Sequence, residues 1–467
     1  MILALAATLA IVVHDRTALR AEPRSSAPEL ATLWQGDVLE VRGDQSGYLK
    51  VYNYRRERGG YVSSETVRPI EITEPEAPEL LAVVRFLREN PGFEALGISY
   101  GAAYLKAVPA RALTAEPYDA IARMAERLAD QATDGGLHHS NVATHIDVAE
   151  QFGIRMHTFE RNGRVQLCYD GELFRRVLNL GTASSEQRAH AALGLTRPDC
   201  IDPDLGPVPR AALDDERGAL LDLVNERELS ALTKSRLHAR RAGVWASIAF
   251  EHARQHRSAQ AAAQRAITEV LAVNAGDLGD DLRAEYEDAL IRVGAIRWAA
   301  IPDKVQAGAL MLSASSGEPG QTCIALQGAP PQRSEPLARR CTYGIVWMAS
   351  AQAIAQSRAL VLAVQPLESW RELWLFHEKA GDWVIDVLSP AAVDPEQGYV
   401  EFAGFAPGPK RLLIAREVRD RGRNRRRFEE MRLDDLAIVR QASTPDLLRD
   451  FGQWQDAAWR RNTLALR

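Results

Sequence analysis

The spacing of apolar residues changes twice along the chain, and each change marks a different kind of predicted structure. From about residue 9 to residue 70, short segments with alternating apolar and polar residues, such as 38–42 and 48–52, are separated by Gly and Asp turns. Alternation with a period of two, interrupted at such short intervals, is typical of a small all-β domain. An acidic, Pro-containing stretch at 72–78 follows and predicts a linker.

Helical periodicity occupies the middle of the chain. Apolar residues three or four positions apart predict amphipathic helices at 80–87, 118–131, 141–152 and 173–178. The Asn162–Gly163 pair, which lies between two strand-like segments, predicts a β-hairpin among these helices. Four further amphipathic segments between 210 and 300 predict a helical bundle or tetratricopeptide-like hairpins.

Strand-like segments return in the C-terminal part. The candidate strands are 343–348, 359–364, 372–376, 383–388, 399–402 and 410–415. Turn signals between them predict an antiparallel β-sandwich or open barrel, which a helix at 445–458 would follow.

A chain of 467 residues is too long for one ordinary core, so we predict a multidomain α+β protein. The predicted domains are a small barrel at 9–70, a helical domain with a hairpin at 75–200, a helical bundle at 205–300 and a β-rich domain at 309–467.

Composition, charge and the lack of certain motifs argue against several classes of function. The net charge of −5 argues against a dedicated nucleic-acid-binding protein, which would carry a strongly basic domain. The chain contains no phosphate-binding loop and no dinucleotide fingerprint, so no cofactor is predicted. No segment is long and apolar enough to predict a membrane span.

The cysteines favour an oxidising compartment. They are four in number and include no C-x-x-C pair, which argues for disulfides rather than a zinc site. Cys323 and Cys341 flank a Pro-rich loop and form one candidate bridge, which leaves Cys168 and Cys200 as the other. The alternative is four buried free thiols in a cytosolic protein.

The apolar start of the chain has two interpretations. Ala4-Leu5-Ala6 resembles a signal-peptide cleavage site, so these residues are interpreted as the end of a signal peptide that begins upstream. Alternatively, residues up to Val13 form the first strand of the barrel, and both interpretations are compatible. With the cysteines, the first interpretation predicts a periplasmic or secreted protein.

Three motifs in order across the first domain resemble those of bacterial SH3 domains. They are the stretch 17–28 with Leu19 and Pro23, the segment 33–38 with Gly36, and the closing Gly60-Tyr61-Val62. Two positions depart from the family pattern: Tyr48 replaces the usual Trp, and Ala21-Glu22 stands where a Gly often precedes the Pro.

The resemblance implies a ligand-binding barrel whose partner is a peptidoglycan peptide or an envelope protein. The aromatic residues expected to form the ligand groove are Tyr48, Tyr52, Tyr54, Tyr61 and Trp34. A barrel that only packs against the helical domain remains an alternative.

Two motifs suggest catalysis but lack its usual context. Gly97-Ile-Ser99-Tyr-Gly101 matches the nucleophile elbow of hydrolases, but no strand-like run precedes it, so a glycine-containing helix start is favoured. His252 and His256 have the spacing of a zincin motif, but the glutamate precedes the first histidine, which favours a solvated helix face.

Three other groups of residues are candidate ligand sites. His138, His139 and His145 cluster near Asp147, with His157 further on, but without regular metal-ligand spacing. The arginine-rich run 419–427 predicts a hairpin tip, either solvated or anion-binding. Trp370, Trp374 and Trp383 line either an aromatic groove or, in the favoured interpretation, a β-sandwich core.

These observations favour a non-enzymatic exported protein that acts as an envelope scaffold or adaptor, with no catalytic residue, metal or cofactor. The alternative is a peptidoglycan-directed hydrolase that uses His138, His139 or His145 in the helical middle.

Overall fold

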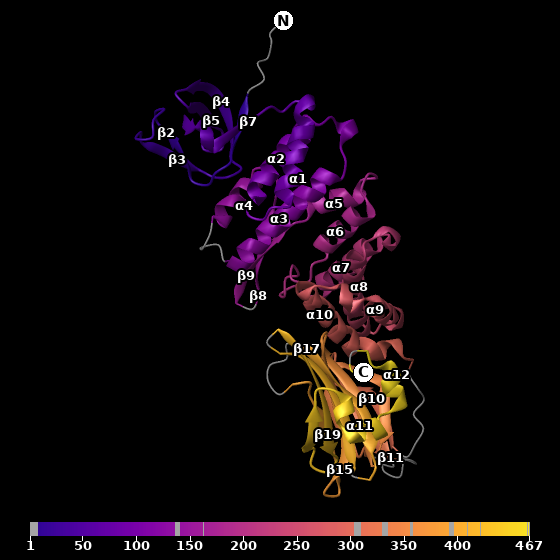
Figure 1. The fold of residues 1–467 in the computed structure, drawn as a ribbon. Coiled ribbons are helices and arrows are strands. Elements are labelled where there is room, and N and C mark those ends of the chain that lie inside the picture. Colours follow the sequence, from indigo (N-terminus) through magenta and orange to yellow (C-terminus); the bar gives the residue numbers. More distant parts are fainter. Residues whose placement is uncertain are drawn as a thin grey trace. The chain divides into compact units, whose positions relative to one another are not determined.

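The computed structural model describes residues 8–135, 141–161, 163–302, 310–328, 335–354, 358–391, 397–408, 410–420, 422–464 and 466 (Figure 1). The chain forms two compact units, which are described separately. Unit 1 comprises Met1–Pro207 and Leu220–Leu229, and unit 2 comprises Val208–Ala219 and Ser230–Arg467. Within the described residues, no helix has both the length and the apolar character that a membrane span requires. The division into four domains stays a prediction.

Unit 1 begins with a seven-stranded antiparallel sheet. Its strands are β1 (Leu9–Val12), β2 (Thr17–Arg20), β3 (Glu29–Leu33), β4 (Val38–Gln45), β5 (Tyr48–Asn53), β6 (Arg58–Ser63) and β7 (Val67–Ile70). The hydrogen-bonded order is β3-β2-β6-β5-β4-β1-β7. Every strand contributes to one apolar core, from Ala10 in β1 to Val67 in β7, so the sheet must curl around that core.

The prediction of a closed barrel is not confirmed. Among the described residues, the two end strands β3 and β7 are not hydrogen-bonded to each other, so the sheet keeps two edges. The N-terminal segment does form a strand, β1, between β4 and β7. The signal-peptide motif at Ala4–Ala6 lies outside the described residues.

The helices of unit 1 pack against this sheet and around a hairpin. They are α1 (Ala77–Arg88), α2 (Glu94–Ala107), α3 (Glu116–Gly135), α4 (Val142–Glu150), α5 (Glu172–Asn179) and α6 (Ser185–Leu195). The predicted hairpin is confirmed as β8 (Met156–Arg161) and β9 (Arg164–Tyr169). Ile11 and Ile70 of the sheet share an apolar core with α1, α2 and α3, so sheet and helices form one packed body. Cys168 and Cys200 form a disulfide.

Unit 2 contains a helical part and a β-rich part. Most of α7 (Pro207–Asp222) belongs to it, with α8 (Ala231–Arg254), α9 (Gln260–Ala272), α10 (Asp280–Ile296) and the 3₁₀-helix η6 (Arg297–Ala300). These helices match the four amphipathic segments expected between 210 and 300.

Two sheets form the β-rich part. The smaller one has the order β10 (Leu310–Ser316), β11 (Thr322–Gly328) and β12 (Ala338–Thr342). The larger one contains β13 (Ile345–Ile354), β14 (Ala359–Leu367), β15 (Trp370–Lys379), β16 (Asp382–Leu388), β17 (Gln397–Ala406), β18 (Arg411–Asp420), β19 (Arg423–Arg432) and β20 (Ile438–Ala442). Its pairing is antiparallel except for a short parallel contact between β15 and β17.

The two sheets share an apolar core. Leu310 and Ile324 of the smaller sheet pack with Leu362 and Trp374 of the larger one, as expected for a sandwich. Cys323 and Cys341 lie directly opposite each other on β11 and β12 and form the second disulfide.

The predicted C-terminal helix is interrupted. Instead of one helix at 445–458, the chain forms α11 (Arg449–Trp454) and α12 (Ala457–Asn462). Between them, Gln455 forms a β-bridge with Gly404 of β17, and this pairing replaces helical hydrogen bonds at that point.

A buried carboxylate, Glu401 on β17, joins the helical and β-rich parts of unit 2. It forms ion pairs with Arg297 of η6 and with Arg371 of β15, whose Nη2 lies 2.7 Å from Glu401 Oε1. Trp459 of α12 donates its indole N–H to Glu401 Oε2 at 2.7 Å. Burial alone would raise the pKa of Glu401, but the charges of both arginines lower it to about 2.

We expect Glu401→Gln to destabilise unit 2 by about 3–5 kcal/mol, because it leaves Arg371 and Arg297 buried without a counter-charge. The contribution of Glu401 is present above the unfolded pKa of 4.5 and is lost as the pH falls towards 2, so the difference between the proteins narrows in acid. Urea unfolding at neutral and acidic pH measures both effects. The control is Asp435→Asn, which removes a solvent-exposed pair with Arg432 and should change the stability much less. Equal losses in the two variants would contradict the prediction.

For a second buried carboxylate, Asp119 in α3 of unit 1, the pKa is shifted in the opposite direction, upward. Its side chain is 2% exposed, and its Oδ1 has no hydrogen-bond partner among the described residues. Burial raises the pKa of Asp119 to about 6, although the charges of Arg123 and Arg88 oppose the shift. The folded state therefore disfavours the ionised form.

Asp119→Asn should stabilise unit 1 by roughly 1–3 kcal/mol at pH 8, because the wild-type carboxylate is ionised there at a cost. Below the unfolded pKa of 3.8 the carboxyl group of Asp119 is protonated in both states, so its ionisation costs no stability. This cost develops as the pH rises from 3.8 through the folded-state pKa of about 6. At pH ~4 the two proteins should therefore differ little. Thermal or urea unfolding at both pH values gives the test, with the exposed Asp134→Asn on the same helix as control. A gain that does not depend on pH would show that ionisation of Asp119 is not its cause.

Candidate functional site

The four tyrosines expected to bind ligand share the outer face of the N-terminal sheet. Along β5, Leu49 and Val51 point into the core, so Tyr48 and Tyr52 point outward. Tyr61 of β6 lies directly opposite Lys50 and therefore points to the same side. This surface, formed by Tyr48, Lys50, Tyr52, Tyr54 and Tyr61, is called the tyrosine face below.

Charged side chains of β4 order one end of the tyrosine face. The rings of Tyr52 and Tyr54 meet edge to face, with centroids 5.0 Å apart. The Arg42 guanidinium lies 4.2 Å from the centroid of Tyr52, in a cation–π contact. Glu40 pairs with Arg42 at 2.9 Å and accepts a hydrogen bond from the Tyr54 hydroxyl at 2.6 Å, which fixes the position of the ring.

These contacts shift the pKa values of Glu40, Arg42 and Tyr54. The hydrogen bond to Glu40 raises the pKa of Tyr54 above its ordinary value, and the hydrogen bond from Arg42 lowers the pKa of Glu40. Sequence analysis did not assign Glu40, Arg42 or Lys50 to the site. The alternation in 38–42 and 48–52 places these residues on one face only once the pairing of the strands is known.

Trp34 lies outside β5 and β6, the strands that carry Tyr48, Tyr52 and Tyr61. It follows β3 in the turn to β4, where its backbone N–H donates to Asp37 Oδ2 at 2.9 Å. Among the described residues, no ring contact links Trp34 to a tyrosine of the face. Its proposed role in binding therefore needs a test separate from that of the tyrosines.

The turn that contains Trp34 attaches the sheet to the helices of unit 1. Gly36 has a φ of 92°, and a Cβ there would lie 2.7 Å from the Ala95 carbonyl oxygen of α2. Ser99 of α2 donates its hydroxyl to the Gly36 carbonyl oxygen at 2.6 Å. Ser99 is thus a buried residue inside a helix, and the nucleophile-elbow interpretation is wrong.

A second turn, between β1 and β2, contacts the start of α4. Its Asp15 accepts a hydrogen bond from Asn141 at 3.0 Å and pairs with His145 Nε2 at 2.8 Å. Burial would raise the pKa of Asp15, but the hydrogen bond and charge of His145 lower it. His145 therefore acts as an anchor for the sheet, while His138 and His139 lie outside the described residues.

The remaining sequence candidates are dispersed. His157 stacks on Phe159 in β8, with ring centroids 6.2 Å apart. His252 lies within α8, whereas His256 follows the end of that helix with a φ of 55°, so the pair does not share a helix face.

The tryptophans and the arginine run of unit 2 are largely structural. Trp370 and Trp374 are buried, as expected for core residues, and Trp383 packs beside that core. The arginine run forms the predicted hairpin of β18 and β19. Several of its side chains pair with carboxylates, among them Arg419 with Asp288 and Arg426 with Glu417.

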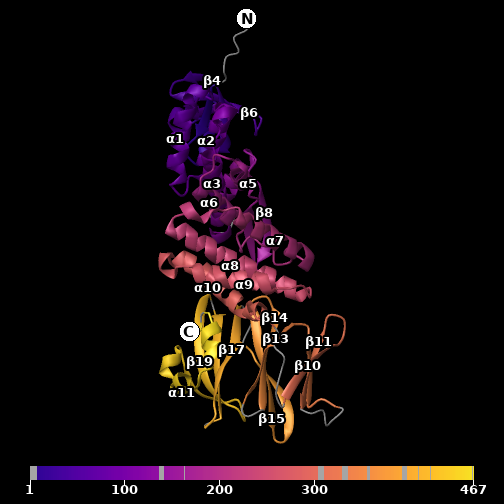
Figure 2. The same ribbon diagram turned by 90° about the vertical axis from the view of Figure 1, so that its right-hand side faces the viewer.

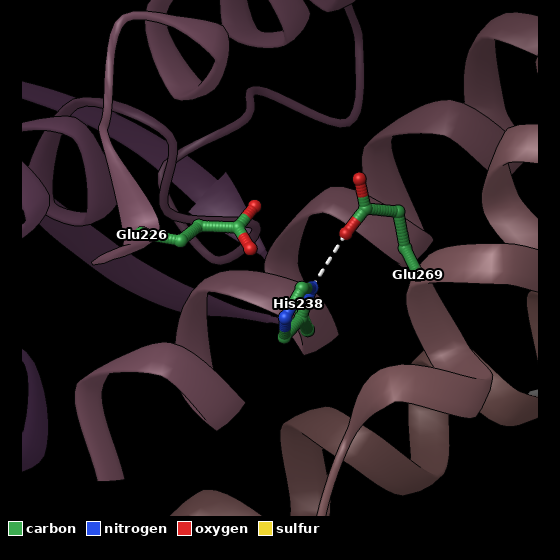
Figure 3. Close-up of side chains that lie close together, drawn as sticks. All are labelled: Glu226, His238 and Glu269. Carbon is green, nitrogen blue, oxygen red and sulfur yellow. Dashed lines mark hydrogen bonds and ion pairs between the residues drawn. The ribbon is translucent and has the colours of Figure 1, made fainter. Parts of the chain in front are cut away.

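Unit 2 also contains a buried histidine–carboxylate pair. His238 Nδ1 of α8 lies 2.7 Å from Glu269 Oε2 of α9, as the dashed line in Figure 3 shows. Burial would raise the pKa of Glu269, but the hydrogen bond with His238 lowers it. Glu226, also drawn in Figure 3, belongs to unit 1. The pair links α8 to α9.

Comparison with known families identifies the first part of the chain. Residues 15–68, which include the anchoring turn and the tyrosine face, match the family model of the bacterial SH3 domain. The resemblance seen in the sequence is therefore confirmed for this segment. No curated protein and no solved structure matched the chain.

Glu40→Gln should lower the pKa of Tyr54 towards the ordinary tyrosine value, because it removes the carboxylate that accepts the hydrogen bond of the Tyr54 hydroxyl. Tyrosine carbon-13 NMR, with the Tyr54 signal assigned through Tyr54→Phe, follows this titration. The matched control is Glu65→Gln, an exposed glutamate of the same domain. If Tyr54 titrates alike in the wild type and in Glu40→Gln, the contact does not persist in solution.

Proposed function

We propose that the protein is a non-enzymatic, exported SH3-domain protein that binds a cell-wall peptide or a protein partner and serves as an envelope scaffold or adaptor. The observation that carries the proposal is the tyrosine face on a domain that matches the bacterial SH3 family.

The two sides of the SH3 domain support this assignment. The turn with Gly36 and residue Asp15 attach the domain to α2 and α4. Tyr54, in contrast, is 66% exposed and is held in place by Glu40. An ordered, exposed aromatic surface reduces the entropy lost on binding, because its rings are already positioned.

The chemistry of the face suits a peptide. Tyrosine rings provide apolar contact area together with a polar hydroxyl group. Lys50 and Arg42 supply positive charge and Glu40 supplies negative charge, so both the acidic and the basic groups of a peptide would find partners.

Export is supported by the two disulfides, Cys168–Cys200 and Cys323–Cys341, because such bridges persist mainly in oxidising compartments. The alternative, an envelope hydrolase that uses histidines of the helical region, gains no support from His145, whose ring is engaged by Asp15.

Tyr52→Ala combined with Tyr54→Ala should weaken binding to purified peptidoglycan by roughly tenfold, because two aromatic contacts are lost. Cosedimentation of the full chain at several peptidoglycan concentrations measures this change. Phe86→Ala provides the control, since Phe86 is 67% exposed on α1 and lies outside the tyrosine face.

Failure of the unmodified protein to sediment would exclude the cell wall and leave a protein partner as the ligand. Sedimentation that both variants retain in full would place the wall contact elsewhere and contradict the role of the tyrosine face.

A further inference from the structure

A cleft of about 700 Å³ opens in unit 2, at the connection between α8 and α9. Its other walls come from η6 and from the strands β10, β11 and β13. Figure 2 shows this helical layer next to the ends of β13 and β14. The volume lies within the range of pockets that hold small organic ligands.

Basic side chains form one side of the cleft. Arg254 is the last residue of α8, and His256 and Arg257 follow it in the connection. All three are exposed, and the described residues that line the cleft include no Asp or Glu.

Neither arginine of the cleft forms an ion pair among the described residues, and Arg254 has only a Coulombic interaction with Glu251 of the same helix. Other arginines of unit 2, such as Arg292 and Arg416, pair directly with glutamates. The cleft therefore has unbalanced positive charge, which an anionic ligand would neutralise.

Aromatic and apolar side chains form the rest of the lining. Trp298 of η6 is half-buried there, and the guanidinium carbon of Arg297 lies 4.1 Å from the centroid of its ring. Tyr343 is 66% exposed, and its hydroxyl donates to Glu318 at 2.7 Å, which holds the ring in place. Ile345 and Met348 of β13 complete this apolar part. Indole and phenol rings offer faces against which a planar group stacks.

We propose that this cleft binds a small organic anion in which a planar ring carries a phosphate or carboxylate group. Arg254 and Arg257 contact the anionic group, since guanidinium binds both kinds of oxyanion in a bidentate manner. Trp298 and Tyr343 contact the ring. This site is independent of the tyrosine face and of the function proposed for it.

The test is calorimetric titration of the full chain, at low ionic strength, with four probes: phenyl phosphate, benzoate, inorganic phosphate and benzyl alcohol. We expect at least one of the two aromatic anions to bind roughly tenfold more tightly than both the ring-free and the uncharged probe. The comparison of phenyl phosphate with benzoate shows which anionic group the cleft prefers.

Arg254→Gln combined with Arg257→Gln should weaken binding of the preferred probe by roughly tenfold or more. The control, Arg440→Gln with Arg449→Gln, removes the same charge from exposed positions of unit 2 outside the cleft and should leave binding unchanged. Trp298→Leu should reduce the ratio of the affinity for the aromatic anion to that for inorganic phosphate, because it removes the ring contact.

Three results would overturn the proposal. They are no heat of binding with either aromatic anion, equal affinity for benzyl alcohol, and an equal loss in the control variant, which would indicate general electrostatic attraction.

Discussion

The buried carboxylate of Glu401 on β17 binds side chains from η6, β15 and α12. It pairs with Arg297 and Arg371, and Arg371 in turn donates to the carbonyl oxygens of Gly294 and Ala295 at the end of α10. Because an unpaired buried charge costs several kcal/mol, these segments must come together or all lose stability. Gly294 permits the approach, since a Cβ there would lie 2.5 Å from the Tyr399 ring. The helical and β-rich parts thereby form one compact unit.

Much of the fold was predictable where one face of an element is polar. The helices α1, α3 and α4 and the hairpin of β8 and β9 match their sequence patterns. Helix α2 was predicted only as a helix start at Gly97–Gly101, because almost all its residues are buried and polar residues do not recur with a helical period. Most of strand β19 was not predicted, because its run of arginines lacks the alternation of apolar and polar residues. In the structure these arginines pair with carboxylates such as Glu417 and Asp420. Such pairing depends on strand register, which local sequence does not specify.

The candidate site shows the same division. Alternation along 48–52, with the closing motif at Tyr61, was enough to select tyrosines that do share one face. The position of Arg42 was not predictable, because the register shifts between Val41 and Gly43 and leaves Arg42 over the Tyr52 ring. Trp34 was selected for its type alone, and its turn serves the attachment to α2.

That attachment determines how the SH3 domain can work. A domain on a flexible linker adapts its orientation to each ligand, whereas here Gly36 and Asp15 fix the sheet against α2 and α4. Ile11 and Ile70 also belong to the core that those helices build. If the tyrosine face binds a partner, as proposed, these packed contacts would hold that partner in a defined orientation relative to the helices of unit 1, which is what a scaffold requires.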